Sequence, residues 1–406
     1  MSTNSLLTPS IIAKETLAIL ENNLVAAGKV NRQFENQFNK IGNTITVRKP
    51  NKFTVTSGPG LSIQNVTEPS TAITISNQKH VDFQFSTSDL TLVIEEFSDR
   101  YLKPAAAKLA NQVDFDVLTN FQQVYNQVGT PGVVPNAFSF LAQVGQRMDE
   151  GAVPQDGRVL ILNPAANWAL ATALSSGVYV KSVAEPAFKG FLAALANFEI
   201  YLDQNIQSQT TGNYGGTFSS VTGLTTGVGS VNGAGQTGST LVTNGWVTGI
   251  AALLNVGDVF TVQGVYAVNP MNLTSTGSLQ NFTVTAQASS DGSGNSTIGI
   301  SPAITVTGAY QTVSASPANG AAITVRGAAG TSYAQNIAFV RDCFGLVMVP
   351  MELPQGVDFA ARQMWKGMSL RIVRQYDINN DVLPCRIDLL YGTATFYPEL
   401  GVRLTN

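Results

Sequence analysis

The chain has 406 residues, and its 23 basic and 26 acidic residues make up only 12% of the sequence. An ordinary soluble domain carries roughly 25% charged residues, so about half of the usual charge is missing. The formal net charge is −3 and no basic cluster occurs, which argues against a surface that neutralises many phosphates by direct nucleic-acid binding. The length leaves room for roughly two or three domains.

The cysteines and the histidine limit the available chemistry. Cys343 and Cys385 cannot build a disulfide framework, and His80 alone cannot complete a zinc site that needs four ligands. We therefore expect two buried, reduced thiols. The N-terminal sequence lacks the basic and apolar regions of a signal peptide, and no apolar run approaches about 18 residues, so we expect synthesis in the cytosol.

The first segment predicts a helix from Pro9 to Ala27. Thr8 and Pro9 form a favourable N-cap and first-turn pair, and Gly28 is suited to the C-terminal end. Apolar residues recur with helical spacing and predict one stripe that packs against a partner. The stripe comprises Ile12, Ile19, Leu20 and Leu24.

Residues 43–92 change to a period of two, which is typical of extended strands. The turn signal Ser57-Gly-Pro-Gly60 divides them, so we expect a long two-stranded projection. Such a projection is marginally stable in water and is expected to rest on another surface. The apolar positions are Ile45, Val47, Phe53, Val55, Ile73, Ile75, Val81, Phe83 and Phe85.

Residues 104–128 predict a second helix, which begins at Pro104 and ends before Gly129. Its length would be roughly 37 Å at 1.5 Å per residue. The apolar stripe comprises Ala105, Leu109, Val113, Val117, Phe121, Val124 and Val128. Residues 136–209 then predict a mixed α and β region, with helices at 138–148, 164–174 and 191–196 and strands at 159–162 and 198–202.

The composition changes abruptly at Thr210. The 123 residues up to Ser332 contain 21 of the 37 glycines, but only Asp258, Asp291 and Arg326 are charged. Short β-type runs at 259–262, 282–285, 297–300 and 322–325 predict an all-β barrel or sandwich. Strands at 346–349, 370–373 and 386–390 follow, so the β region is predicted to be inserted into a mixed host domain.

Three features resemble catalytic or cofactor motifs, and we interpret each as structural. Gly233-Ala-Gly235-Gln-Thr-Gly238 matches a dinucleotide fingerprint, but no helix can follow it in this glycine-rich context. His80 has no nearby catalytic partner, so we expect a solvated or interface histidine. Glu95 and Glu96 are interpreted as acidic residues near a helix start. We predict no catalytic, cofactor-binding or metal-binding residues, no cofactor, and no enzymatic activity.

Several short motifs occur in order along the chain. They are Lys108-Leu-Ala-Asn-Gln-Val113, Gly257-Asp-Val-Phe-Thr-Val-Gln-Gly-Val265, Val268-Asn-Pro270, Asp291-Gly-Ser-Gly-Asn295, Ile300-Ser-Pro302-Ala-Ile304 and Cys385-Arg-Ile-Asp-Leu-Leu-Tyr-Gly392. Taken together, they resemble the major capsid proteins of tailed bacteriophages, in particular the podovirus coat-protein family, which carries an insertion domain on the Hong Kong 97-type fold.

The resemblance implies an α+β fold with an N-terminal arm, an extended β loop, a long spine helix, peripheral and axial domains and an inserted barrel-like β domain. The implied boundaries are 1–30 for the N-terminal arm, 31–92 for the extended loop and its flanking segment, 93–132 for the spine helix of the peripheral domain, 133–209 for the axial domain, 210–335 for the insertion domain and 336–406 for the return strands of the axial and peripheral domains.

The implied function is self-assembly, as hexamers and pentamers, into the icosahedral shell that encloses the phage genome. The partners would be other copies of the chain, a scaffolding protein during assembly and a portal at one vertex, without a membrane. The enclosed double-stranded DNA would be held without sequence-specific binding. The protein would be made in the host cytoplasm and end in the virion.

Two alternatives remain open. A bacterial nanocompartment shell protein shares the fold but would not be expected to carry the glycine-rich insertion. An adhesive or glycan-binding protein would also be rich in Thr, Asn and Gly. It would be expected to show a secretion signal and clustered aromatics or acidic calcium ligands, and residues 210–332 offer only Asp258 and Asp291.

Overall fold

The computed structural model describes residues 9–33, 44–64, 66, 68–86, 102–175, 194–214, 228–365 and 368–406. The chain divides into two compact units. Unit 1 comprises the described residues of Met1–Arg48, Ser70–Leu118 and Phe344–Phe396. Unit 2 comprises those of Lys49–Pro69, Thr119–Cys343 and Tyr397–Asn406.

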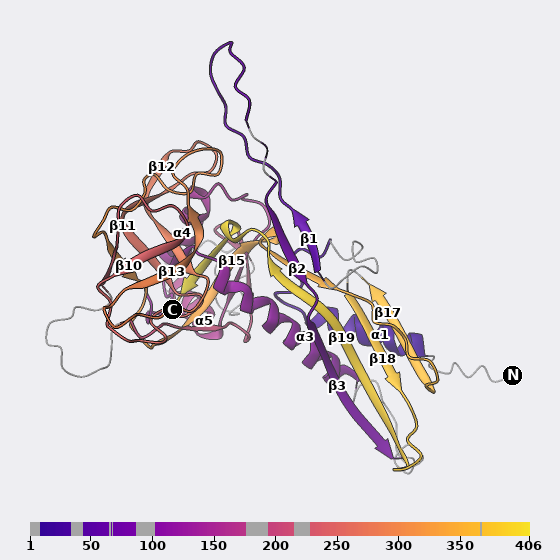
Figure 1. The fold of residues 1–406 in the computed structure, drawn as a ribbon. Coiled ribbons are helices and arrows are strands. Elements are labelled where there is room, and N and C mark those ends of the chain that lie inside the picture. Colours follow the sequence, from indigo (N-terminus) through magenta and orange to yellow (C-terminus); the bar gives the residue numbers. More distant parts are fainter. Residues whose placement is uncertain are drawn as a thin grey trace. The chain divides into compact units, whose positions relative to one another are not determined.

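Unit 1 is built on an antiparallel sheet of five strands in the order β16-β19-β18-β17, with β3 paired to the long strand β19. Figure 1 shows β3, β19, β18 and β17 side by side. One face is apolar because residues of the same parity in each strand, such as Ile372 and Ile387, are buried. The strands are β3 (Asn77–Ser86), β16 (Phe344–Met348), β17 (Phe359–Trp365), β18 (Met368–Arg374) and β19 (Val382–Thr395).

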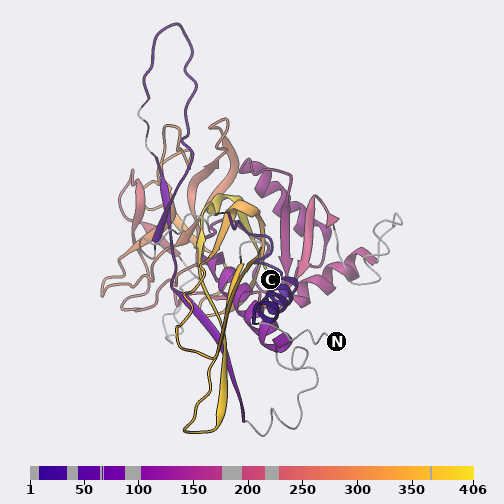
Figure 2. The same cartoon turned by 90° about the vertical axis from the view of Figure 1, so that its right-hand side faces the viewer.

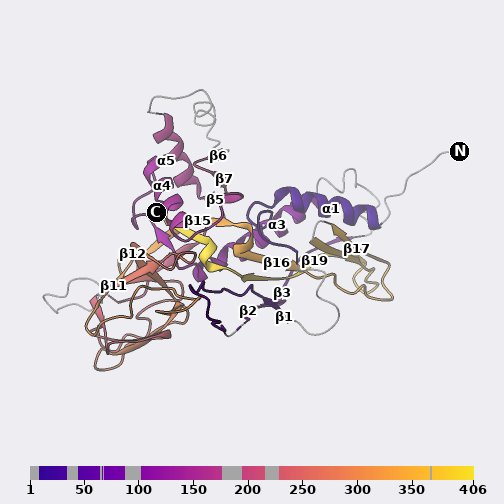
Figure 3. The ribbon, with the colours of Figure 1, turned by 90° about the horizontal axis from the view of Figure 1, so that it is seen from above.

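Two helices cover this sheet, and they differ from the sequence prediction in length and rotation. Helices α1 (Pro9–Asn23) and α3 (Lys103–Leu118) lie side by side (Figure 3). The predicted end of the first helix at Ala27 is wrong, because the buried Asp114 carboxylate accepts the N–H groups of Val25 and Ala27 at 2.8 and 2.7 Å. These bonds hold the chain in a turn after the helix.

The apolar stripe predicted for α1 is also rotated. The fully buried side chains are Ala13, Thr16, Leu17 and Leu20, whereas Ile19 is partly exposed. Ala13 and Thr16 are too small to stand out in a search for large apolar residues. Of the predicted stripe, Leu20 is confirmed as buried, Leu24 is only partly buried, and nothing is described for the side chain of Ile12.

The second predicted helix is confirmed in position but is too long. Helix α3 has 16 residues, about 24 Å, and is followed by the 3₁₀ turn η3 (Thr119–Gln123) and the strand β4 (Gln127–Val128). Leu109, Val113 and Val117 are buried as predicted. Beyond them, the β-branched Val128 pairs in a sheet with Leu404, so its helical spacing was coincidental.

The predicted strands of residues 43–92 are confirmed only in part. Strands β1 (Thr44–Arg48) and β2 (Ser70–Thr74) pair, and β3 follows, but Phe53 and Val55 lie in a loop without strand pairing. Residues 87–92 lie outside the described residues. Thr44 and Thr74 face each other, and Ile73 is fully buried.

Unit 2 contains a mixed sheet of seven strands, in the order β4-β20-β15-β5-β7-β6, with β8 also paired to β15. Helices α4 (Phe138–Glu150) and α5 (Pro164–Ser175) pack against it and confirm two predicted helices. The predicted helix at 191–196 is wrong where it is described, since β6 forms there and Ala196 and Asn197 make a turn with positive φ. The additional strands are β5 (Arg158–Leu162), β6 (Ala194–Leu195), β7 (Phe198–Leu202), β8 (Ser208–Thr210), β15 (Ser332–Val340) and β20 (Gly401–Thr405).

Unit 2 also contains a closed six-stranded antiparallel barrel. The four predicted β runs lie in its last four strands, whereas the first two are rich in Gly, Ser and Thr and lack the apolar alternation that marks a strand. Phe260 and Phe282 stack in the core with ring centroids 5.8 Å apart. The strands are β9 (Val228–Val231), β10 (Gly238–Asn244), β11 (Val259–Val268), β12 (Ser275–Val284), β13 (Ser296–Ile304) and β14 (Ala322–Val325).

Two short 3₁₀ turns, η4 (Arg341–Cys343) and η5 (Pro398–Leu400), complete the described elements. None of the helices in the described ranges has both the length and the apolar character needed to cross a membrane.

Candidate functional site

The glycine-rich motif that resembles a dinucleotide fingerprint forms a turn. Gly233–Gly238 forms the turn between β9 and β10, where Gly233, Gly235 and Gly238 have φ of +99°, +75° and +93°. Such values favour glycine, which explains the motif without a ligand. Glu95 and Glu96 lie outside the described residues.

His80 lies on the exposed part of β3, directly opposite Asp388 of β19. Its Nδ1 is 2.7 Å from an Asp82 carboxylate oxygen, and the two side chains are 43% and 53% exposed. The fully buried Asp388 instead binds two arginines: Arg371 with both carboxylate oxygens, at 3.0 and 2.6 Å, and Arg386 at 3.0 Å. Both Asp388 oxygens are therefore paired with guanidinium groups, and this carboxylate offers no unpaired general base.

The two thiols are buried and free, as predicted. Burial raises the pKa of Cys385 to about 11 and that of Cys343 well above its ordinary value. A thiol with a raised pKa is rarely a thiolate at neutral pH, so neither is suited to nucleophilic chemistry. Within the described residues, no group of three or more His, Cys, Asp or Glu side chains could hold a metal ion.

A buried arginine is the most constrained polar group of unit 2. Arg403 of β20 is 1% exposed and donates to the carbonyl oxygens of Val124, Gln122 and Gly257 at 2.6, 2.9 and 2.7 Å. It also donates to the Thr283 hydroxyl at 3.1 Å, and its guanidinium lies 5.2 Å from the centre of the Phe121 ring. One side chain therefore joins the segment after α3 to two barrel segments.

Asp258 supports the same junction from the barrel. Its carboxylate, 1% exposed, accepts the N–H groups of Gly212 and Asn255, both at 2.8 Å, and the Gln209 amide at 2.9 Å. Burial is the main cause that raises its pKa, and the hydrogen bonds and the Arg403 charge oppose this rise. Burial likewise lowers the pKa of Arg403 to about 9, which leaves it charged at neutral pH. The sequence does not reveal this junction, because its residues are far apart in the chain and match no motif.

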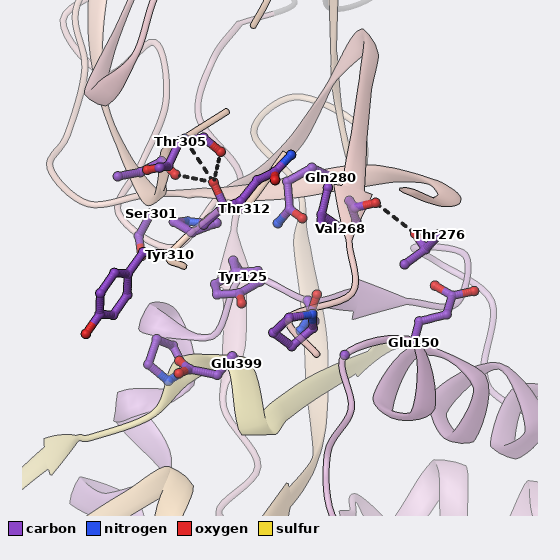
Figure 4. Close-up of a pocket in the computed structure, with 18 of the residues that line it drawn as sticks. Tyr125, Glu150, Val268, Thr276, Gln280, Ser301, Thr305, Tyr310, Thr312 and Glu399 are labelled. Atoms are coloured by element: carbon purple, nitrogen blue, oxygen red, sulfur yellow. Dashed lines mark hydrogen bonds between the residues drawn. The ribbon is translucent and has the colours of Figure 1, made fainter. Parts of the chain in front are cut away.

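A cavity of about 330 Å³ lies between the barrel and a wall formed by the segment before β4, the end of α4 and η5 (Figure 4). On the barrel side, the Thr312 hydroxyl donates to the Ala303 carbonyl at 2.6 Å and accepts a hydrogen bond from the Thr305 N–H at 3.0 Å. Tyr125 and Glu399 lie on the other side. Most of the lining residues have polar side chains, and three prolines lie among the rest.

The loop between β1 and β2 exposes an unusual number of apolar side chains. Phe53 is 64% exposed, Val55 99%, Leu61 89% and Ile63 83%. Figure 2 shows this segment as two extended limbs joined by a turn, where Gly58 has a φ of +108°. Few hydrogen bonds join the two limbs. The Gln64 side-chain amide accepts from the N–H of Thr54 and donates to its carbonyl oxygen.

The base of this loop is attached within unit 2. The backbone N–H of Lys52 donates to the Tyr310 hydroxyl at 3.2 Å, and its ammonium lies 5.9 Å from the centre of that ring. Lys49 lies over the Tyr397 ring at 5.0 Å. The loop is therefore anchored at one end and exposes apolar side chains beyond the anchor, which is typical of a segment that binds another molecule.

Comparison with known proteins identifies the class. The family model described as P22 coat protein, gene protein 5, matches residues 1–406. The chain therefore belongs to the P22 coat protein family. It is a bacteriophage major capsid protein, a structural protein whose copies assemble into the icosahedral shell of the virion.

Solved structures of low identity are also similar. The structure from Mycobacterium phage Che8 is 13% identical, with 94% of this chain and 90% of that chain covered and a TM-score of 0.49. The capsid of Ralstonia phage GP4 is 8% identical, with 90% and 84% covered and a TM-score of 0.44. The virus-like particle from Pyrococcus furiosus is 10% identical, with 97% of each chain covered and a TM-score of 0.38. No curated protein matches the chain.

Proposed function

We propose that this capsid protein has a Hong Kong 97-type fold and assembles as hexamers and pentamers around double-stranded DNA. A scaffolding protein guides assembly, a portal occupies one vertex, and the DNA is enclosed without sequence-specific contacts. The subunit is made in the host cytoplasm and has no enzymatic activity. The buried thiols and the fully paired Asp388 carboxylate are consistent with a structural role.

The proposed domain organisation follows the boundaries given above. Residues 1–30 form an arm, and 31–92 contain the extended loop. The spine helix lies in 93–132, the axial domain in 133–209, the insertion domain in 210–335 and the return strands in 336–406. The closed barrel of β9 to β14 supports the insertion domain, since a closed barrel needs no strand from elsewhere to satisfy its edges.

The observation that carries the proposal is the exposure of the loop at residues 49–69. Four large apolar side chains from Phe53 to Ile63 are at least 64% exposed in the single chain. Burial of apolar area contributes roughly 25 cal/mol per Å², so covering such side chains on a neighbouring copy favours association. Residues 53–67 of the loop contain no charged side chain, so little charge is desolvated when they are covered.

The test is assembly of a shortened loop. Deletion of Ser57–Leu61 should leave a folded subunit, because these residues are exposed and form no part of either sheet or of the barrel. In the presence of the scaffolding protein, that subunit should no longer close into uniform shells by sedimentation and electron microscopy. Leu61→Ser, which keeps the loop length, separates the contribution of the side chain from that of the length. Normal shells from the deletion variant would overturn the proposed role of the loop.

A further inference from the structure

A second pocket of unit 2, which no step of the proposed assembly uses, lies between α4 and the barrel. It has a volume of about 410 Å³, and polar side chains line it together with the apolar Val128 and Leu279. Two of the polar side chains are arginines: Arg147 from α4, and Arg326 from the segment directly after β14. We call this cavity the Arg326 pocket.

The acidic group in the Arg326 pocket is already satisfied. One Glu150 carboxylate oxygen is 3.3 Å from Arg147, and the other accepts hydrogen bonds from the Gln146 amide at 2.9 Å and the Ser278 hydroxyl at 3.3 Å. Arg147 also donates to the Asn126 side chain at 3.1 Å. The charges of Glu150 and Arg147 therefore compensate each other, and the charge of Arg326 remains.

Arg326 has no ion pair or side-chain hydrogen bond to any residue within the described ranges. Burial lowers its pKa, and the next contribution is the positive charge of Arg147. A guanidinium nevertheless keeps its charge in proteins, and it offers five N–H donors in a planar fork. Arg326 is half-buried and has no anionic partner among the described residues, so a bound anion would compensate a partly desolvated positive charge.

We propose that the Arg326 pocket binds a small oxyanion of the phosphate class. The planar fork of Arg326 would hold two oxygens at once, the geometry in which arginine binds phosphate and carboxylate groups. Neutral donors line the same cavity and could bind the remaining oxygens; they include the Gln143 amide and the Thr261 hydroxyl. Because the ligand would contact both α4 and the barrel, it would stabilise the junction between them.

The experiment measures inorganic phosphate binding to the full-length subunit. Equilibrium dialysis with labelled phosphate, at constant ionic strength set by chloride, should give one saturable site per chain. At 100 times the dissociation constant, phosphate should raise the folded-to-unfolded ratio by about 100-fold in urea denaturation. Arg326→Gln should abolish both effects. Arg341→Gln removes an exposed arginine of the same unit and should leave both unchanged.

Arg326→Lys keeps the test decisive if the Gln variant does not fold. Lysine retains the charge but not the bidentate fork, so we expect phosphate to bind about tenfold more weakly. Absence of saturable binding to the wild-type subunit would overturn the proposal. It would also fail if either Arg326 variant bound phosphate as tightly as the wild type. These outcomes are independent of shell formation, so they leave the proposed assembly role unaffected.

Discussion

The barrel and the loop segment 53–67 are both poor in charge, but the barrel buries its apolar side chains and the loop exposes them. The barrel encloses Phe260, Phe282 and Ile298, each with no exposed surface. The loop leaves Phe53 and Val55 open to solvent. Low charge therefore has two different physical consequences within one chain.

The difference lies in strand pairing. Each barrel strand has a partner on both sides, so the barrel forms a closed core that depends on no other molecule. The two limbs of the loop share few hydrogen bonds and no strand pairing, so the loop itself cannot bury its apolar residues. We infer that the stability of the barrel is internal, whereas the loop gains its stability only when another copy covers it.

The same substitution in the two regions gives the largest contrast. Phe282→Ala should lower the free energy of unfolding by about 3–5 kcal/mol, since it removes a ring from a packed core and leaves a cavity. Phe53→Ala should change it by less than about 0.5 kcal/mol, because that ring is already 64% exposed. Urea denaturation of the unassembled subunits, with comparable m-values, measures both.

Equal losses in the two variants would contradict the comparison. They would mean that Phe53 is buried within the free subunit and that the loop forms part of the internal core. A folded Phe282→Ala variant that assembles normally would show that the barrel tolerates a cavity without a loss of assembly.

The sequence predicts the barrel strands better than the contacts that attach the barrel to the rest of unit 2. Period-two runs identify β11 to β14, because their alternation reflects local geometry. The Arg403 junction brings Val124, Gly257 and Thr283 to one guanidinium, and no local pattern links residues that are more than a hundred positions from it. Helix ends are missed for the same reason: Asp114 fixes the turn after α1 from a distant helix.

In the loop, strand-like alternation does not indicate where the side chains lie. Phe53 and Val55 alternate as in a strand, but both lie in a loop without strand pairing. Alternation cannot tell whether such residues are buried within the chain or left exposed. Their exposed fractions of 64% and 99% show that the chain itself does not bury them.

A smaller loss of stability should follow when the barrel attachment is weakened. Arg403→Met removes four donated hydrogen bonds and leaves three buried carbonyl groups with fewer partners, but it also removes a buried cation. We expect a net loss of about 2–3 kcal/mol in the free energy of unfolding. Urea denaturation monitored by near-UV circular dichroism should report this loss.

Arg403→Lys is the matched variant for charge. It keeps the cation but not the planar fork, so it should recover only part of the loss. An Arg403→Met subunit as stable as the wild type would mean that the junction is held by apolar packing alone. Exposed Arg341→Met should be neutral within about 0.5 kcal/mol.

The smallest change in stability is expected for a charge placed on the loop. This substitution tests most directly whether the loop, unlike the barrel, is covered only in the assembled shell. Val55→Asp adds a carboxylate to a side chain that is 99% exposed, so the unassembled subunit should unfold within about 0.5 kcal/mol of the wild type. If another copy covers this residue in the shell, assembly must desolvate the new charge, which costs several kcal/mol for each contact. Sedimentation with the scaffolding protein should then show subunits and aberrant particles in place of uniform shells.

Thr56→Asp, at the neighbouring exposed position, adds the same charge without the loss of an apolar side chain. A weaker defect in Thr56→Asp than in Val55→Asp would locate the contact at the valine. Uniform shells from Val55→Asp would show that this part of the loop stays in solvent after assembly.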